Sequence, residues 1–339
     1  MKILTVGCGS IGTRHAANAA RHGEVAVHDV SADAAGSCAA AIGARVFERL
    51  EDALAWGPTA AVVATPHRSH LPVARRAIEA GAHVLIEKPL SDTLDGVSEL
   101  LALAESRGKR AYVVCNMRFH PGPSTLRRNL GLVGRPLFAR AHVGNYLPDM
   151  RPGTDYRRLY AARRADGGGV VLDAIHEIDY LTWLFGDIDS VSCRTATLGD
   201  LEIDVEDHAL LALTHHNGAR SSAELDYLRR HKSRGCEIVG TDGVLVWASQ
   251  GKNPERCSVR IYRGNGGDGE RLVDAPAIDT AQPYRDLMAA FLEEIERPGS
   301  TAMLTARRAA ANLAVAQAAL QSAERTGASV TPREWSRKS

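Results

Sequence analysis

The chain has 339 residues, of which 45% are apolar and 24% are charged, so we expect a globular protein of about two domains. Its 41 basic residues nearly balance 40 acidic ones, and a net charge of +1 provides no global field for binding nucleic acid or a membrane. We expect neither a signal peptide nor a membrane-spanning segment. The six cysteines show no CxxC pair and no zinc spacing, so we expect no metal site, reduced thiols and a cytoplasmic location.

The first 118 residues alternate between short β-branched runs and Ala- and Leu-rich stretches of helical length. Strands are expected over 2–7, 25–30, 60–65, 83–88 and 111–116, and helices over 12–21, 32–41, 71–80 and 94–107. Continuously apolar strands that alternate with helices are typical of a parallel sheet covered on both faces. Residues 1–118 are therefore predicted to form a doubly wound α/β domain of the Rossmann type.

The pattern changes after residue 118, where residues 119–169 are rich in Pro, Gly, Arg and Tyr and predict exposed crossover loops. One amphipathic helix is expected over 170–185, and two more over 282–296 and 305–324. Between them, strands are expected over 190–197, 208–214, 220–228, 235–239, 243–248 and 258–263, with a turn at 265–267. Residues 119–339, with a frayed tail at 334–339, are thus predicted as a second α/β domain. An antiparallel sheet with few helices to cover it predicts a homodimer or homotetramer.

A glycine-rich turn, Gly7-Cys8-Gly9-Ser10-Ile11-Gly12, links the first strand to the first helix. In this GxGxxG pattern the three glycines allow a tight turn, close approach of a pyrophosphate and close packing of the helix on the sheet. The helix N-terminus adds amide donors and a positive dipole end. We therefore expect this turn, including Ser10 and Ile11, to bind a dinucleotide.

Asp29 ends the second predicted strand, where the ribose of a bound adenosine would lie. A carboxylate accepts a hydrogen bond from a ribose hydroxyl and repels a 2′-phosphate, and no Arg follows in Val30-Ser31-Ala32. The sequence therefore predicts NAD in preference to NADP. Alternatively, Asp29 caps the next helix, although Ser31 is available for that role.

Four further motifs follow in a fixed order along the chain. They are Thr65-Pro66-His67-Arg68-Ser69-His70, Glu87-Lys88-Pro89, Asn116-Met117-Arg118-Phe119-His120-Pro121, and Gly167–Gly169 before Asp173 and His176. This combination resembles the Gfo/Idh/MocA family of oxidoreductases over nearly the whole chain. The resemblance implies a Rossmann domain, a second domain with a large, mostly antiparallel open-faced sheet, a pyridine nucleotide, and a sugar or cyclitol substrate.

Thr65, Lys88 and Asn116 each follow a predicted parallel strand, and ligands of such sheets bind outside the carboxyl ends of the strands. The resemblance implies that Lys88 contacts both cofactor and substrate and that a cis peptide bond often precedes Pro89. Because residues alternate along a strand, Glu87 is not expected to be the partner of Lys88. Besides the glycine turn and Asp29, the residues expected around the cofactor are Thr65, Pro66, His67, His70, Glu87, Lys88 and Asn116.

Asp173, His176 and Asp179 are spaced three apart and share one side of the predicted helix, opposite an apolar stripe. The family pattern usually places its Asp four residues before the His, whereas Asp173 lies three residues before His176. Either one helical turn is reset here or one acid is displaced. We predict Lys88, His176 and Asp173 as catalytic residues, although ordinary surface acids and a structural histidine would give the same pattern.

The predicted reaction is hydride transfer between a nicotinamide and a secondary alcohol or ketone of a sugar, amino-sugar or cyclitol. A neutral imidazole suits proton transfer near neutral pH, and an ammonium stabilises an alkoxide. Arg and Tyr in residues 146–166 suggest an anionic substituent on the substrate. The expected substrate contacts are Lys88, Arg118, Tyr156, Arg157, Arg163, Asp173 and His176. A redox-neutral hydrolase, lyase or epimerase that passes through a transient keto-sugar, and an NAD-binding regulatory protein without catalysis, remain as alternatives.

Overall fold

The computed structural model describes residues 1–252, 254–264, 267–299 and 302–334, which divide into two compact units. The first unit comprises Met1–Asn116 and Ala281–Ala310, and the second comprises Met117–Thr280 and the chain from Ala311 onward. Residues 281–310 therefore group with the first unit, whereas the sequence suggested one boundary at residue 118. Residues 265–266 of the expected turn and 335–339 of the expected tail lie outside the described residues.

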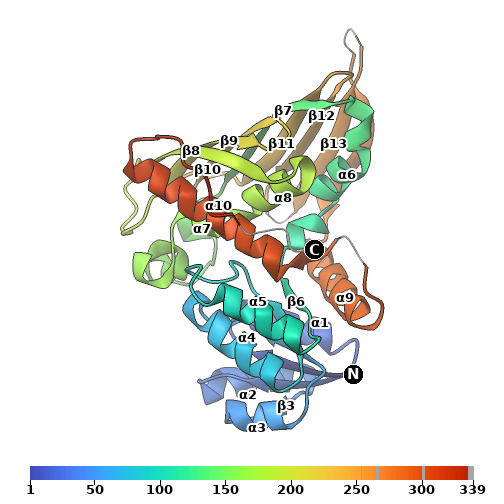
Figure 1. Ribbon diagram of the computed structural model, residues 1–339, viewed down its shortest axis with the longest axis vertical. Helices are drawn as coiled ribbons and strands as arrows, with labels where there is room; N and C mark the ends of the chain where they lie inside the picture. Colours follow the sequence, from blue (N-terminus) through green and yellow to red (C-terminus); the bar gives the residue numbers. More distant parts are fainter. Residues whose placement is uncertain (253, 265–266, 300–301, 335–339) are drawn as a thin grey trace. The chain divides into compact units, whose positions relative to one another are not determined.

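The first unit contains a seven-stranded sheet in the order β15-β6-β5-β4-β1-β2-β3 (Figure 1). Its strands are β1 (Lys2–Val6), β2 (Glu24–His28), β3 (Arg45–Val46), β4 (Ala60–Val63), β5 (His83–Ile86), β6 (Ala111–Val113) and β15 (Leu304–Thr305). Strands β1 to β6 pair in parallel, and β15 joins the β6 edge antiparallel. Because the chain order reverses between β1 and β4, the turn after β1 lies at the topological switch point, where such sheets bind ligands.

The helices of the first unit are α1 (Ser10–Ala19), α2 (Ala32–Ile42), α3 (Leu50–Ala55), α4 (His70–Glu79), α5 (Val97–Ser106) and α9 (Gln282–Glu296). The predicted Rossmann-type parallel sheet is confirmed, and β4 is fully buried along its length because helices cover both faces. β3 and α3 were not expected from the sequence, because they have only two and six residues and are too short to show a periodicity.

The second unit contains an eight-stranded sheet in the order β14-β13-β12-β11-β7-β10-β9-β8. Its strands are β7 (Pro136–Gly144), β8 (Ile188–Ala196), β9 (His208–His215), β10 (Arg220–Asp226), β11 (Ser233–Gly240), β12 (Val244–Gln250), β13 (Glu255–Tyr262) and β14 (Glu270–Ile278). All neighbours pair antiparallel except β7 and β10, which pair in parallel. The mostly antiparallel sheet is confirmed, but it consists of two meanders joined through β7.

Two strands of this sheet were not expected from the sequence. The segment that contains β7 was interpreted as loop, because Arg140 and His142 interrupt its apolar residues and lie on one face of the strand. Strand β14 is an edge strand without a fully buried residue, so it lacks an apolar face that would reveal it. The crossover also contains α6 (Pro121–Asn129) and five short 3₁₀ turns at Leu130–Val133, Leu147–Asp149, Tyr156–Arg158, Tyr160–Ala162 and Arg164–Asp166.

In the described part of the chain, helices pack against one face of the second sheet and leave the other open. In β9, Ala209, Leu211 and Leu213 are buried, whereas Leu210 between them is 49% exposed. Helices α6 and α8 (Ile175–Phe185) contact the strands on the packed face, and α10 (Ala306–Glu324) runs alongside (Figure 1). The open-faced sheet expected from the resemblance is therefore present.

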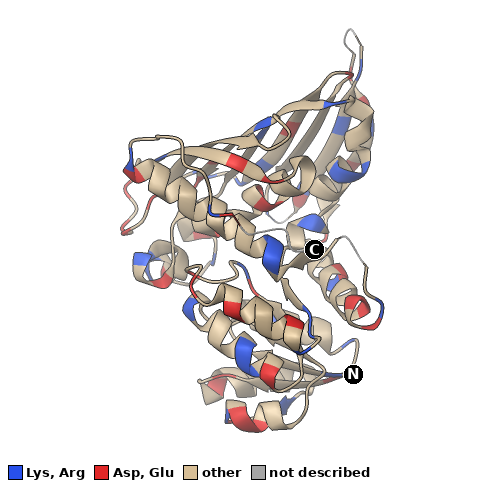
Figure 2. Ribbon diagram, viewed as in Figure 1, with Lys and Arg blue, Asp and Glu red and all other residues tan. Residues whose placement is uncertain are grey.

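The chemical character of the surface agrees with the balanced composition. Figure 2 shows acidic and basic residues interspersed along the elements of both units.

All six cysteines are buried free thiols. Among the described residues, no helix combines the length and the apolarity needed to cross a bilayer.

Candidate active site

The turn between β1 and α1 has the geometry that its three glycines suggested. Gly7 has φ of +96°, and a Cβ there would lie 2.5 Å from the carbonyl oxygen of Ala64. A Cβ on Gly12 would lie 1.8 Å from the carbonyl oxygen of Gly7, so neither position tolerates a side chain. Gly9 is exposed, and a Cβ there would meet nothing within 4 Å. Two glycines thus shape the turn, and the third keeps open the space beside it.

Asp29 lies directly after β2 and supports this turn. Its Oδ2 accepts a hydrogen bond from the backbone N–H of Cys8 at 2.6 Å, and its Oδ1 accepts one from the N–H of Ser31 at 2.8 Å. The helix cap of α2 is Ser31, whose Oγ accepts from Ala34, so Asp29 is not the capping residue. The next side chain, Val30, is fully exposed and offers an apolar surface that the sequence analysis did not identify.

His70 links the ends of two neighbouring strands. Its imidazole is fully buried, with Nε2 at 2.8 Å from the carbonyl oxygen of Thr65 and Nδ1 at 2.9 Å from that of Pro89. Burial lowers the pKa of His70, although the contacts with the carbonyl oxygens of Pro89 and Thr65 act in the opposite direction. The Lys88–Pro89 peptide bond is cis, as the resemblance implied. His70 therefore supports the turns that carry Thr65 and Lys88, and its own contact with a cofactor stays a prediction.

Glu87 points toward α1. Its Oε1 lies 2.7 Å from Nε2 of the fully buried His15, and its Oε2 accepts a hydrogen bond from the backbone N–H of Lys88. Burial raises the pKa of Glu87, but His15 and Lys88 outweigh this effect and hold the pKa below its usual value. As expected from strand alternation, the carboxylate has another main partner and fixes the backbone at Lys88.

Three predicted site residues follow adjacent strands of the first sheet. Thr65, Lys88 and Asn116 come just after β4, β5 and β6, and all three side chains are half-buried. The hydroxyl oxygen of Thr65 is buried and has no hydrogen-bond partner among the described residues. An orphaned polar atom at this edge of the sheet is suited to a ligand group.

Arg118 and Asp179 form a buried ion pair within the second unit. The guanidinium donates to both carboxylate oxygens at 2.8 and 2.9 Å, and the side chains are 7% and 3% exposed. Asn312 donates to the same carboxylate, and the guanidinium lies 5.3 Å from the Trp183 ring. Asp179 is therefore not a surface acid. Arg118 has a clear internal role, and its expected contact with a substrate stays a prediction.

The helix predicted over residues 170–185 is interrupted, which corrects that expectation. α7 (Val170–Asp173) ends at Ala174, whose φ and ψ are −90° and +28°, and α8 begins at Ile175. Asp173 and His176 are half-buried on either side of the break, whereas all other residues from Gly169 to Leu181 are buried. The break resets the helix between them, which accounts for the three-residue spacing.

A phenol binds the carboxylate of Asp173, and a second phenol is buried nearby. Tyr160, from the preceding 3₁₀ turn, donates a hydrogen bond to Asp173 Oδ1. The hydroxyl of Tyr227, directly after β10, is buried without a hydrogen-bond partner among the described residues, and burial, then Asp173 and Tyr160, raise its pKa well above the usual value. Neither phenol was among the predicted site residues. The only available signal for Tyr160 was the Tyr- and Arg-rich composition of its segment.

The predicted anion-binding residues of the crossover are engaged with neighbouring groups. Arg157 forms ion pairs with Asp155 and Glu202, which raise its pKa, with Asp155 as the larger cause. Arg163 lies 3.2 Å from Asp166. The hydroxyl of Tyr156 accepts a hydrogen bond from the backbone N–H of Glu202. Substrate contact by these residues stays a prediction, and the acids nearby reduce their capacity to bind an anion.

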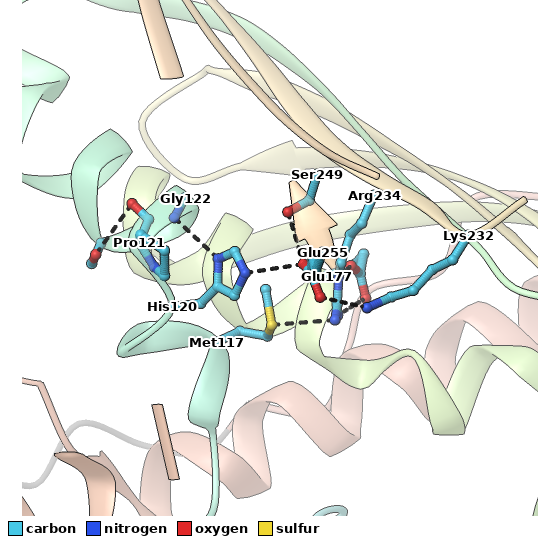
Figure 3. Close-up of polar contacts among 10 residues, drawn as sticks. Met117, His120, Pro121, Gly122, Glu177, Lys232, Arg234, Ser249 and Glu255 are labelled. Carbon is cyan, nitrogen blue, oxygen red and sulfur yellow. Dashed lines mark hydrogen bonds and ion pairs between the residues drawn. The ribbon is translucent and has the colours of Figure 1, made fainter. Parts of the chain in front are cut away.

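A second buried network stabilises the start of α8 (Figure 3). Arg234 donates to both oxygens of the fully buried Glu177 at 2.6 and 2.9 Å and contacts the sulfur of Met117. Glu255 accepts from Lys232 at 2.8 Å and from Ser249 at 2.8 Å, and His120 lies 3.2 Å away (Figure 3).

The charge state of this network follows from its contacts. Burial raises the pKa of Glu255, but the bond with His120 and the charge of Lys232 outweigh it and lower the pKa to about 2. Glu177 follows His176 directly in the chain, so its ion pair with Arg234 also fixes the backbone at His176.

The residues of the first unit fit an NAD molecule. The open space at Gly9, the acceptor at Asp29 and the orphaned hydroxyl of Thr65 lie at the carboxyl ends of β1, β2 and β4, which are neighbours in the sheet. These are the positions that hold a pyrophosphate, a ribose and a nicotinamide half in this fold.

Comparison with known proteins agrees with this geometry. Residues 1–115 match a family described as "Oxidoreductase family, NAD-binding Rossmann fold", and residues 129–246 match the "GFO/IDH/MocA C-terminal domain". The chain is 30% identical over 313 residues to dTDP-3,4-didehydro-2,6-dideoxy-alpha-D-glucose 3-reductase of Streptomyces violaceoruber, covering 89% of this chain and 87% of the relative. It is 28% identical over 271 residues to 1,5-anhydro-D-fructose reductase of Ensifer adhaerens, covering 77% of each.

Solved structures show the same fold at lower identity. A levoglucosan dehydrogenase in complex with NADH has a TM-score of 0.82 at 20% identity, covering 98% of this chain and 99% of that one. UDP-N-acetylglucosamine 3-dehydrogenase from Acidithiobacillus ferrooxidans has a TM-score of 0.80 at 24% identity, covering 96% and 98%. The chain thus belongs to the Gfo/Idh/MocA family of oxidoreductases and is an NAD-dependent dehydrogenase.

Proposed function

We propose that this enzyme oxidises a secondary alcohol of a sugar or cyclitol, or reduces the corresponding ketone. The observation that carries the proposal is the break at Ala174, which leaves Asp173 and His176 as the half-buried polar pair in an otherwise buried stretch of chain. The similarity to a sugar reductase across 89% of the chain supports this substrate class.

Each catalytic residue has a distinct role in the proposal. NAD, when bound, accepts or supplies the hydride at its nicotinamide ring. His176 takes the proton from the substrate hydroxyl, because a neutral imidazole is a suitable base near pH 7. Lys88 donates a hydrogen bond to a substrate oxygen and stabilises the negative charge that develops there. Asp173, which accepts a hydrogen bond from Tyr160, orients a substrate hydroxyl or His176.

The substitution Lys88→Ala tests the central role of the ammonium. We expect turnover to fall by a factor of about 10³, because an electrostatic group aimed at a developing oxyanion contributes on this scale. NADH binding, followed by fluorescence titration, should persist, because the glycine turn and Asp29 are unchanged. The matched control is Lys109→Ala, which removes another lysine of the same unit, between α5 and β6. Unchanged turnover in the Lys88 variant would exclude Lys88 from the mechanism.

The release of NADH provides the second readout. A dehydrogenase produces NADH in solution in proportion to the substrate consumed. An enzyme that oxidises its substrate transiently and then reduces it again releases none. Measuring absorbance at the NADH band over a panel of sugars and cyclitols therefore distinguishes the proposed reaction from a redox-neutral one.

We also propose that the enzyme is a homo-oligomer in the cytoplasm. The open face of the second sheet exposes Leu210, and such a face is suited to pairing with a second copy. Six free, buried thiols are typical of a reducing compartment. Light scattering measures the first property, and a monomer at micromolar concentration would contradict it.

A further inference from the structure

The turn between β10 and β11 carries four consecutive basic residues, Arg229, Arg230, His231 and Lys232, and is fixed at both ends by buried carboxylates. At its start, Asp226 accepts hydrogen bonds from the backbone N–H of Arg229 at 2.7 Å and from its Nε at 3.2 Å. At its end, Lys232 pairs with Glu255. The carboxylate side chains are 9% and 5% exposed. Two such restraints hold an exposed basic turn in one conformation.

The middle of the turn presents one guanidinium on an aromatic surface. Arg230 is exposed, and its guanidinium carbon lies 3.6 Å from the centre of the Tyr146 ring. Stacking of this kind leaves the N–H edge of the guanidinium directed outward. Arg230 forms no ion pair with a carboxylate among the residues that the structure describes. Its donors are therefore positioned and available.

A second basic side chain approaches the same segment from another loop. Lys252 donates to the carbonyl oxygens of Asp149 and Met150 at 3.2 and 2.9 Å, three and four residues after Tyr146. The backbone N–H of Gly251 also bonds to the carbonyl of Lys232. Loops 145–150, 227–232 and 250–252 are thus joined by hydrogen bonds and carry the charges of Arg230 and Lys252.

The basic cluster follows a strand of the second unit that packs against the helix carrying the candidate catalytic carboxylate. Helix α7, which ends at Asp173, contacts β10, and the turn follows β10 directly. Tyr227, at the start of the turn, accepts a hydrogen bond at its backbone oxygen from the N–H of Leu147. We infer that Arg230, with Lys252 and His231, binds a phosphoryl group of the substrate, as in a sugar phosphate or a nucleoside diphosphate sugar. The inference rests on the proposed function. It assigns the anion to this turn instead of to the crossover arginines Arg157 and Arg163, which already form ion pairs with nearby acids.

Phosphoryl groups fit the cluster better than a carboxylate. A phosphoryl group carries up to two negative charges and several acceptor oxygens, and it matches a guanidinium fork together with further cationic donors. A single carboxylate needs only one such fork. The exposed and stacked arrangement also differs from the internal pairs of Arg118 and Arg234, in which a protein carboxylate accepts from the Nε and Nη2 donors of the guanidinium.

The test measures binding of inorganic pyrophosphate and inorganic phosphate by calorimetry, with NAD saturating so that the glycine turn is occupied. We expect pyrophosphate to bind, and Arg230→Gln to weaken it by about ten- to a hundredfold, the effect of losing a charge-assisted hydrogen bond. The control Arg135→Gln removes an exposed arginine beyond the opposite end of β7 and should leave binding unchanged. Lys252→Gln should weaken binding to a smaller extent.

The outcomes separate this inference from the proposed function. Tighter binding of pyrophosphate than of phosphate would assign the group to a nucleoside diphosphate, and equal binding would assign it to a sugar phosphate. No pyrophosphate binding by the wild-type protein, or equal binding by the Arg230 variant, would overturn the inference. The alcohol panel with NAD tests the dehydrogenase reaction independently, so an enzyme that is active on neutral sugars and does not bind pyrophosphate loses only the phosphoryl site.

Discussion

The buried ion pair between Arg118 and Asp179 leads to a quantitative prediction for Arg118→Ala. The substitution would deprive the Asp179 carboxylate, whose side chain is 3% exposed, of its guanidinium partner, while Asn312 still donates to it. Removing one partner of a buried pair costs about 3–5 kcal/mol, because the other charge remains desolvated. The free energy of unfolding of the second unit should fall by this amount.

Urea denaturation followed by tryptophan fluorescence measures this change. Trp183 and Trp247 both belong to the second unit, and Trp183 lies directly on the Arg118 guanidinium. With an m-value of about 2–3 kcal/mol/M, the loss corresponds to a midpoint lower by about 1–2.5 M. The control is Arg127→Ala, which removes an exposed guanidinium from the same tryptophan ring, at 5.8 Å, without leaving a buried charge. It should cost less than about 1 kcal/mol.

A contrary result would change the role of Arg118. If Arg118→Ala left the midpoint within about 0.3 M of the wild type and raised only the KM, the internal pair would contribute little. Arg118 would then act mainly on the substrate, as its position in the sequence motif suggested. A lower midpoint with an unchanged KM in the folded protein would support the structural role.

Three further predictions concern other parts of the chain. The pKa of Glu255 is lowered to about 2 from a usual 4.5, so the stability that its carboxylate contributes is present above pH 4.5 and is lost as the pH falls toward 2. Because Glu255→Gln removes this titrating group, we expect the variant to lose less stability in acid than the wild type. Urea midpoints measured from pH 6 to 2.5 should decline less steeply in the variant, and equal slopes would refute the assignment. Gly9→Ala should leave the melting temperature unchanged and weaken NADH binding at least tenfold, because its Cβ enters open space beside the turn. Gly12→Ala should instead destabilise the first unit, since its Cβ would lie 1.8 Å from a backbone oxygen, and equal melting temperatures for the two variants would contradict this geometry.

The local sequence determined the parts of the protein that depend on short stretches of chain. The tight turn over residues 7–12 depends on its glycines, because Gly7 and Gly12 have no room for a Cβ. The apolar runs form parallel strands because helices bury both faces. The ordered motifs identified the family and placed Lys88 and Asn116 at strand ends, where the chain necessarily leaves the sheet.

Tertiary structure decided which charged residues have partners. Arg118 and Arg157 have the same side chain, yet Arg118 is buried against Asp179, 61 residues away in the chain. Arg157 is instead exposed beside Asp155 and Glu202, and Glu202 lies 45 residues away in the chain. The break at Ala174, the position of β7 between two meanders and the stack of Arg230 on Tyr146 likewise depend on long-range packing. Residue type and local spacing predict that a charge is present, but burial and partners come from segments distant in the chain. Only the folded protein brings these segments together, and therefore only the fold determines which charges remain available for a ligand.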